Sequence, residues 1–265
     1  MAAFAVLASG CTAGAVQGTG RFVPTCKPVF FGVAGSGQGP SNPPPGRLPA
    51  GVTLTDGHRY GATVGLLKTK LATLAGSGLA AASAVDYPAI PLGQYLGPTG
   101  LSPALKASEG AGVRTLVAAI RARQRGGCGT RPVLLSGYSQ GAEVVVQAVA
   151  ALRPAERRHV AVALFGNPSY RPGLPGDYPG KTKAAGLRPT FQSTAFNLPS
   201  DVRRRTLDIC APGDPVCGVD PNQPTVFDKI TWILDHADVH RNAYAYGPAG
   251  YAEQAARFLW QYRTR

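Results

Sequence analysis

The sequence predicts an α/β fold, in which a parallel β-sheet is covered by helices on both faces. Short, nearly all-apolar runs alternate along the chain with segments of helical periodicity, which is the pattern typical of such a sheet. The apolar runs carry few polar residues, as expected of strands that are buried on both faces. The chain has 265 residues, of which 44% are hydrophobic, so it can bury a sizeable core.

Five segments are predicted to be the strands of this sheet. They are short, they consist mainly of apolar or small residues, and they span 29–33, 81–85, 132–136, 160–165 and 206–210. The first reads Val-Phe-Phe-Gly-Val and is followed by a loop rich in glycine and proline. Because no internal repeat and no domain boundary interrupts the alternation, we expect a single domain.

Four segments are predicted to be helices. They span 59–76, a stretch that begins at Ser102, 140–152 and 251–262. Ser102 followed by Pro103 provides an N-cap and then a proline at the first helical position. Helices placed between successive strands supply the crossover connections that a parallel sheet requires.

Residues 1–25 are predicted to be an export segment and linker, and residues 26–265 a single domain. The first residues are apolar and end in small residues before Cys11, like the tail of a secretory signal. The residues before Cys11 also resemble a lipobox, although Ala8 stands where leucine, valine or isoleucine is usual. We therefore expect a secreted or extracellular protein, with lipid anchoring to the cell envelope through Cys11 as a further hypothesis.

The chain is strongly basic, with 27 Lys and Arg against 14 Asp and Glu and a formal net charge of +13. Charge alone suggests a nucleic-acid binder, but no basic block is longer than residues 203–205 and no aromatic residues interleave with basic ones. The composition also excludes a coiled coil, an acidic disordered chain and a multi-span membrane protein. The basic excess instead fits an anionic surface, such as a cell envelope or lipid headgroups.

The chain has five cysteines, an odd number, so in an exported protein one of them would lack a partner for a disulfide. When Cys11 is assigned to the export segment, Cys26, Cys128, Cys210 and Cys217 remain, and these allow three pairings. Cys210 and Cys217 enclose six residues, which favours a local bridge and leaves Cys26 to pair with Cys128. Neither the spacing of the cysteines nor the nearby histidines suits a zinc site.

The sharpest chemical signal is the Gly-Tyr-Ser-Gln-Gly segment at residues 137–141, between a predicted strand and a predicted helix. In that context Ser139 matches a nucleophile elbow, a tight turn that lifts a serine hydroxyl clear of the sheet edge. Gly137 and Gly141 fit this turn because strand and helix pass too closely there for side chains. The backbone N–H groups after the turn suit a developing oxyanion.

A serine hydroxyl is a weak nucleophile, so it needs a base, and the base needs a carboxylate to orient it. His236 and His240 lie shortly before the last predicted helix, and both are candidates for the base. His159 precedes the strand at 160–165, which places it at the opposite edge of the sheet. We therefore interpret His159 as a surface histidine.

The orienting acid is expected just beyond the last predicted strand. Asp214 lies there, between Cys210 and Cys217, and a bridge between these cysteines would hold its carboxylate within reach of an imidazole. Asp208 lies within the strand and Asp220 outside the ring, so both are weaker candidates.

Together these residues resemble the cutinase family of serine esterases, from about Cys26 to the C-terminus. The motifs that carry the resemblance occur in order along the chain: Cys26 before the first strand, Gly35-Ser36 at its end, Tyr87-Pro88-Ala89 after the next strand, Cys128 eleven residues before Ser139, the Gly-Tyr-Ser-Gln-Gly segment followed by Ala142, the Cys-x-x-Gly-Asp-x-x-Cys segment at 210–217, and a histidine and a tyrosine before the last helix. The cysteine spacings make the resemblance more specific than the serine motif alone.

The resemblance implies an α/β-hydrolase fold, a three-layer sandwich with a central parallel sheet of about five strands, helices on both faces and no large lid. By matching position, it implies that Ser139 is the nucleophile, Asp214 the orienting acid and His240 the base. It also implies an oxyanion hole formed by the N–H groups of Gln140 and Ser36, with the Ser36 hydroxyl assisting. The implied bridges are Cys26–Cys128 and Cys210–Cys217.

The chain departs from the family pattern at two places. Ala34 stands where cutinases usually have an arginine before Gly-Ser or Gly-Thr, which bears on the oxyanion loop. The family spaces its histidine and tyrosine as His-x-x-Tyr, but Tyr244 lies one residue further from His240, so His236 stays an alternative base. We favour His240, because Val239 provides the apolar residue that often precedes the base in the family.

The function implied is a secreted serine esterase that hydrolyses carboxylic esters through an acyl-enzyme on Ser139. Its substrates would be cutin-like polyester, short-to-medium acyl esters or lipids. The alternatives are an acyltransferase or an acetylated-polysaccharide esterase with the same triad, and a non-catalytic, envelope-bound binding module. We expect a monomer that needs no metal or organic cofactor and binds no nucleic acid.

Overall fold

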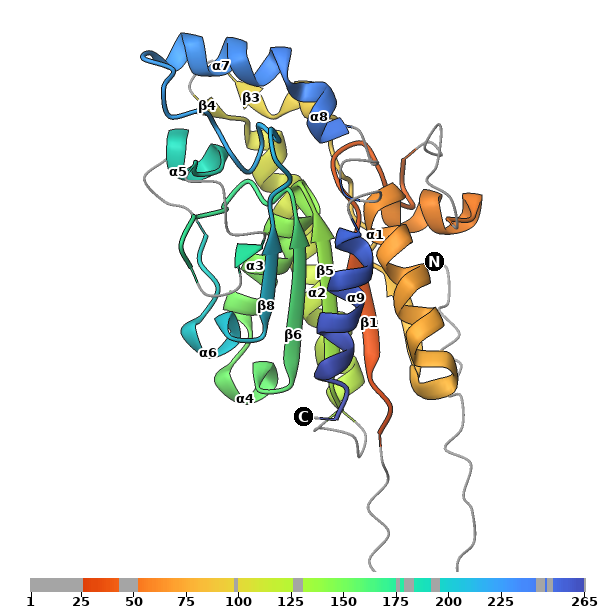
Figure 1. Ribbon diagram of the computed structural model, residues 1–265. Coiled ribbons are helices and arrows are strands. Elements are labelled where there is room, and N and C mark those ends of the chain that lie inside the picture. Colours follow the sequence, from red (N-terminus) through yellow and green to blue (C-terminus); the bar gives the residue numbers. More distant parts are fainter. Residues whose placement is uncertain are drawn as a thin grey trace, which may run out of the picture.

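The computed structural model describes residues 26–42, 52–97, 100–125, 131–174, 177–178, 184–191, 196–241, 246 and 250–264. These residues form a sheet whose strands lie in the order β2-β1-β5-β6-β8-β7 (Figure 1). Every neighbouring pair in this sheet is parallel. The parallel sheet predicted from the alternating pattern is therefore confirmed.

The strands match the predicted segments closely. Their bounds are β1 Val29–Val33, β2 Ala81–Ala84, β5 Val133–Tyr138, β6 Val160–Phe165 and β8 Thr206–Ile209. The sixth strand, β7 (Asp177–Tyr178), has two residues and was not predicted. A separate antiparallel pair, β3 (Leu96–Gly97) with β4 (Gly100–Leu101), was also missed, because two-residue strands leave no periodic signal.

Four long helices cover the sheet, and shorter ones lie in the loops. The long helices are α1 Leu54–Ala75, α2 Pro103–Gln124, α3 Gln140–Ala151 and α9 Tyr251–Gln261. The shorter ones are α4 Pro154–Arg157, α5 Leu187–Phe191, α6 Ser200–Arg203, α7 Val226–Asp235 and α8 Ala237–Arg241, with 3-10 turns at Gly76–Gly78 and Leu92–Gln94. Helices α7 and α8 lie beyond the carboxyl ends of the strands (Figure 1).

The sheet forms the middle of three layers, with α1 and α9 on one face and α2 and α3 on the other (Figure 1). Successive strand residues point to opposite faces, so each strand contributes to two cores. Phe30 and Leu134 belong to the core beneath α1 and α9. Their neighbours Phe31 and Leu135 belong to the core beneath α2 and α3.

The first long helix begins earlier than predicted, at Leu54 instead of residue 59. The Thr53 side chain caps it by accepting a hydrogen bond from the Asp56 N–H at 3.1 Å. Gly61 interrupts the helical backbone with φ 72° and ψ 169°. The predicted start therefore missed residues 54–58, which precede the break.

The second helix begins at the predicted place. Ser102 caps it by accepting a hydrogen bond from the Leu105 N–H at 3.1 Å, and Pro103 is its first residue. In its middle, a Cβ on Gly112 would lie 2.9 Å from Cγ1 of Val144 on α3. The glycine therefore lets α2 and α3 approach each other closely.

The predicted export segment, residues 1–25 with Cys11, lies outside the described residues. Within the described part of the chain, no helix combines the length and apolar character that crossing a bilayer requires.

Candidate active site

Ser139 occupies the turn between β5 and α3. Its φ is 54°, and it is the one residue other than glycine with a positive φ in the described part of the chain. A Cβ on Gly137 would collide with the carbonyl of Gly141, and a Cβ on Gly141 would collide with the carbonyls of Val33 and Ala34. The two glycines therefore allow the strained turn that presents the serine at the carboxyl edge of the sheet.

The structure brings Ser139, His240 and Asp214 together from distant parts of the chain. Nε2 of His240, on α8, lies 2.8 Å from Oγ of Ser139. Nδ1 of the same ring lies 2.9 Å from each carboxylate oxygen of Asp214. All three side chains are buried, with exposed fractions of 1% for Ser139, 4% for His240 and 1% for Asp214.

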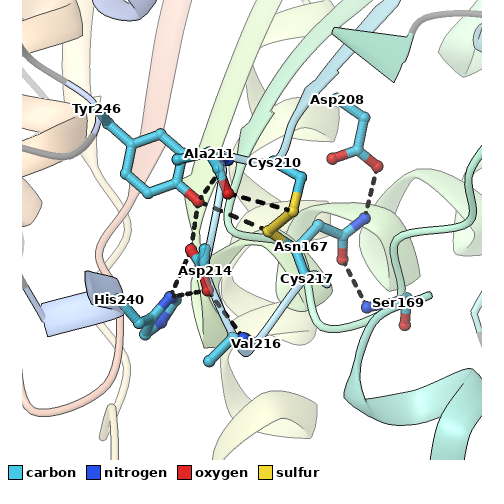
Figure 2. The surroundings of a disulfide bond; sticks show 10 residues. All are labelled: Asn167, Ser169, Asp208, Cys210, Ala211, Asp214, Val216, Cys217, His240 and Tyr246. Atoms are coloured by element: carbon cyan, nitrogen blue, oxygen red, sulfur yellow. Dashed lines mark hydrogen bonds and ion pairs between the residues drawn. A yellow bond between two sulfur atoms is a disulfide. The ribbon is translucent and has the colours of Figure 1, made fainter. Parts of the chain in front are cut away.

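Asp214 lies in a short loop after β8 that is closed by the disulfide between Cys210 and Cys217 (Figure 2). Inside the loop, the Val216 N–H donates to Oδ1 of Asp214 at 2.8 Å. The Asp214 N–H donates to the Ala211 carbonyl at 3.1 Å. The predicted local bridge is confirmed, and the loop that it closes fixes the direction of the Asp214 carboxylate.

The pKa of Asp214 is set by opposing effects. Burial raises the pKa of this carboxyl, but His240 and the hydrogen bonds from Tyr246 and Val216 outweigh burial and leave the pKa below its ordinary value. Asp214 is therefore charged at neutral pH. A charged carboxylate beside Nδ1 fixes the imidazole so that Nε2 faces Ser139.

Tyr246, which was not predicted from the sequence, completes the surroundings of Asp214. Its hydroxyl donates to Oδ2 of Asp214 and accepts from the Ala211 N–H at 3.4 Å (Figure 2). Burial, followed by the charge of Asp214, raises the pKa of Tyr246, so the hydroxyl stays a donor. The sequence pointed to a tyrosine before the last helix, but the one it considered, Tyr244, lies outside the described residues.

Two further residues support His240. The ring of Tyr138 stacks on the imidazole with centroids 4.9 Å apart, and its hydroxyl donates to the His240 carbonyl. A Cβ on Gly166, where β6 ends, would lie 2.9 Å from Cε1 of His240, and the φ of this glycine is 55°. Tyr138 stood in the serine motif, whereas Gly166 gave no signal because its role depends on the fold.

The weaker candidates for the base and the orienting acid make contacts with other residues. His236 ends α7, where Nδ1 lies 2.8 Å from the Trp232 carbonyl and its ring stacks on the Trp232 ring at 4.6 Å. Asp208 accepts from the Asn167 side chain at 2.8 Å, within β8. Asp220 accepts from the N–H of Asn222 at 2.9 Å, outside the disulfide ring.

The two predicted oxyanion residues flank the serine turn. Gln140 begins α3, and its side chain donates to the Ser108 hydroxyl at 2.8 Å. Ser36 follows β1, which pairs with β5, so both segments end at the same edge of the sheet. Oγ of Ser36 is buried and makes no well-formed hydrogen bond among the described residues, although it interacts with the Tyr95 hydroxyl and opposes the rise that burial causes in the pKa of that phenol. Its hydroxyl can therefore turn to a bound group.

The second predicted bridge is described at one end. Cys26 is disulfide-bonded, and Cys128, its predicted partner, lies outside the described residues. Among the residues that the structure describes, no group of three or more His, Cys, Asp or Glu is arranged to hold a metal ion.

Two curated relatives match parts of the chain. The carboxylesterase Culp1 of Mycobacterium tuberculosis is 36% identical over 91 residues, which are 34% of this chain and 36% of that protein. The phospholipase Culp4 of the same organism is 34% identical over 143 residues, which are 50% of this chain and 47% of that protein. The chain thus spans about a third to a half of the length of these relatives.

Solved structures and a family model cover much more of the chain. A cutinase-like protein from Cryptococcus sp. has a TM-score of 0.58 at 20% identity and covers 92% of this chain and 98% of its own. An acetylxylan esterase has a TM-score of 0.60 at 21% identity, covering 89% and 98%. These likenesses confirm the predicted α/β-hydrolase fold. The model of the Cutinase family matches residues 53–261, and this protein therefore belongs to the cutinase family.

Proposed function

We propose that this protein is a carboxylic ester hydrolase that forms an acyl-enzyme on Ser139. The observation that carries the proposal is the continuous chain of contacts from Oγ of Ser139 through the His240 ring to the Asp214 carboxylate, with 2.8 Å and 2.9 Å separations. This order of hydroxyl, imidazole and carboxylate is the one that activates a serine for attack on a carbonyl. Membership of the cutinase family and the carboxylesterase relative support the same reaction.

In the proposed reaction, Nε2 of His240 takes the Ser139 proton as Oγ attacks the ester carbonyl. The N–H groups of Gln140 and Ser36 stabilise the tetrahedral oxyanion, assisted by the buried Ser36 hydroxyl. His240 then protonates the leaving alcohol and later activates the water that releases the acid. Asp214 stays ionised and stabilises the imidazolium in both half-reactions, because its pKa is held below the ordinary value.

For the substrate, we propose short-to-medium acyl esters or lipids. Culp4, which is named a phospholipase, and Culp1, which is named a carboxylesterase, support this class. The net charge of +13 suits esters presented at an anionic surface. An acyl-transfer reaction would use the same acyl-enzyme with an alcohol in place of water.

We also propose that the protein works outside the cytoplasm as a single domain of residues 26–265. The disulfide between Cys210 and Cys217, and the disulfide-bonded state of Cys26, support an oxidising compartment. Cys128 is the proposed partner of Cys26. Lipid attachment at Cys11 stays a further hypothesis, which mass spectrometry of the exported N-terminus tests: the lipid mass would support it, and its absence would contradict it.

The central experiment measures hydrolysis of p-nitrophenyl esters of increasing chain length, together with labelling by a fluorophosphonate. Wild-type protein is expected to turn over the short esters and to be labelled at Ser139, and Ser139→Ala is expected to lose both. His240→Ala and His236→Ala form a matched pair, of which only the first should lose activity, by about 10³-fold or more. Wild-type protein that shows neither turnover nor labelling would overturn the proposal.

A panel of phospholipids, acetylated xylan and an added alcohol acceptor then separates the substrate classes. Release of free fatty acid from phospholipid would support the proposed class. Exclusive release of acetate from xylan, or transfer of the acyl group to the alcohol in preference to water, would replace it with one of the alternatives.

A further inference from the structure

A second buried cluster of charged side chains lies beside the candidate active site. The Arg188 guanidinium contacts two carboxylates: Nη2 donates to both oxygens of Glu109, at 2.8 and 2.6 Å, and Nε donates to Oε1 of Glu143. These residues come from α5, α2 and α3, respectively. Their exposed fractions are 3% for Arg188, 2% for Glu109 and 0% for Glu143, so water does not solvate the charges.

The cluster contains two acids and one permanent cation, so two ionised carboxylates would leave a net negative charge in the interior. Gln147 donates to Oε2 of Glu109 at 2.9 Å, and the Ser169 hydroxyl donates to Oε1 of Glu143 at 2.8 Å. Oε2 of Glu143 is buried and has no hydrogen-bond partner among the described residues. A proton on Glu109 would both balance the charge and give this oxygen a donor.

The cluster also connects the parts of the active site. The Glu143 N–H donates to the Ser139 carbonyl at 3.4 Å, so the Glu143 side chain extends from the first turn after the nucleophile. On the other side, the Leu187 N–H, next to Arg188, donates to the carbonyl of Val216 in the acid loop at 3.0 Å. The Arg188 side chain therefore links the helix that follows Ser139 to the segment that holds the acid loop.

We propose that Glu109 and Glu143 share one proton and form, with the Arg188 cation, a neutral positioning cluster. This cluster fixes the helix that follows Ser139 against the acid loop. Glu109 carries the proton and donates a hydrogen bond to Glu143, while Arg188 bridges the two carboxyl groups. The cluster touches no substrate. It acts through the distance between Ser139 and His240, so this inference rests on the function proposed above.

The ionisable groups around Glu109 favour a protonated Glu109 at neutral pH. Burial raises the pKa of Glu109 to about 9, with the neighbouring Glu143 adding to the rise and Arg188 and Gln147 opposing it. The charges of the two carboxylates also act on Tyr87 and Tyr95, and burial followed by these charges raises the pKa of both phenols. Each phenol therefore stays neutral where Glu109 titrates, and Glu109 is the group that loses its proton as the pH rises through about 9.

Two variants separate the proton from the bridge. Glu109→Gln removes the proton that wild type is expected to lose as the pH rises through about 9. The amide can still donate to Glu143, although its NH2 group cannot accept from Nη2 of Arg188 as a carboxyl oxygen does. Arg188→Lys keeps the positive charge but loses the fork that reaches both carboxylates at once. Arg121→Lys is the matched control, because Arg121 also makes a two-point contact, at 3.0 and 3.2 Å, to a carboxylate, that of Glu156, away from Ser139.

The infrared spectrum tests the proton without any need for activity. Wild-type protein at pH 7 is expected to show the carbonyl stretch of a buried carboxylic acid, which disappears as the pH rises through about 9 and is absent from Glu109→Gln. The same band in Glu109→Gln, or no such band in wild type, would overturn the shared proton. This measurement does not depend on catalysis. It therefore tests the shared proton even if the protein proves not to be an esterase.

Steady-state kinetics on p-nitrophenyl butyrate tests the positioning. Arg188→Lys is expected to lower kcat by about 10- to 100-fold with KM nearly unchanged, whereas Arg121→Lys leaves both unchanged. In wild type, kcat should fall above pH about 9, and Glu109→Gln should lack that fall. The proposal would be contradicted if the two lysine variants had equal effects, or if Arg188→Lys changed KM alone. It would also be contradicted if kcat of Glu109→Gln still fell above pH about 9.

Discussion

Asp214 and Glu109 are both buried carboxylic acids, yet their pKa values move in opposite directions. Asp214 is 1% exposed and Glu109 is 2% exposed, so burial alone does not separate them. Burial raises the pKa of each, but hydrogen bonds and His240 bring the pKa of Asp214 below its ordinary value. The pKa of Glu109 is raised to about 9 by burial first and then by a second carboxylate, Glu143, beside it.

The difference arises from where each carboxylate stands on the backbone. Asp214 lies in a loop, where the Val216 N–H is free to donate to it, and the Tyr246 hydroxyl adds a second donor. Glu109 lies within α2, whose backbone N–H groups are already used by the helix, so only side chains can solvate it. The backbone around Asp214 therefore supplies a donor that helps to keep this acid charged, whereas Glu109 receives none from the backbone of its own helix.

The largest expected effect comes from replacing the charged acid by its amide. Asp214→Asn removes the charge that stabilises the imidazolium and orients Nδ1 of His240, so kcat should fall by about 10³- to 10⁴-fold. The same change at Glu109 should cost little at neutral pH. The measurement is kcat on p-nitrophenyl butyrate for both amide variants, with circular dichroism to show that each is folded. Similar losses in the two variants would remove the distinction between the two acids.

The next effect comes from opening the acid loop. Replacing Cys210 and Cys217 by serine removes a bridge with a sequence separation of 7, which should lower the free energy of unfolding by about 2–3 kcal/mol. Urea denaturation measures this loss. Because the bridge holds Asp214 and not Glu109, kcat should fall while the infrared band of the protonated acid persists. Loss of that band would mean that the bridge also holds the protonated Glu109 in place, and not Asp214 alone.

A smaller effect comes from removing one donor to Asp214. Tyr246→Phe deletes the hydroxyl that bonds Oδ2, which should cost about 1–2 kcal/mol of unfolding free energy at pH 7. The pKa of Asp214 is lowered in the folded protein, so this stabilisation is present above its ordinary value of 3.8 and is lost as pH falls through the folded value. The difference in unfolding free energy between wild type and Tyr246→Phe should therefore become smaller in acid.

Urea denaturation between pH 7 and pH 3 checks this, and Tyr262→Phe is the control. The Tyr262 hydroxyl donates to the Arg204 carbonyl at 3.0 Å near the surface, so its loss should cost less than about 0.5 kcal/mol at every pH. A pH-independent gap for Tyr246→Phe would show that the hydroxyl supports packing only and does not tune the acid.

The features that depend on local pattern could be predicted before the fold was known. Apolar runs of strand length and helices between them predicted the five main strands and the parallel sheet, because a strand buried on both faces must be apolar throughout. The serine turn was predictable because Gly137 and Gly141 frame Ser139 in a short sequence pattern, and the clash that Gly137 avoids, with the Gly141 carbonyl, lies within that pattern. The spacing of Cys210 and Cys217 likewise predicted the bridge around Asp214, which the structure confirms.

Which distant groups meet depends on how the helices and strands pack, and only the folded chain shows it. It placed His240 rather than His236 beside Ser139, because the path of α7 and α8 over the sheet edge cannot be deduced from spacing. It also added Tyr246 to the acid and joined Glu109, Glu143 and Arg188 in one cluster. Long-range polar contacts of this kind carry no periodic signal in the sequence, since each depends on how separate elements pack, and packing is a property of the whole fold.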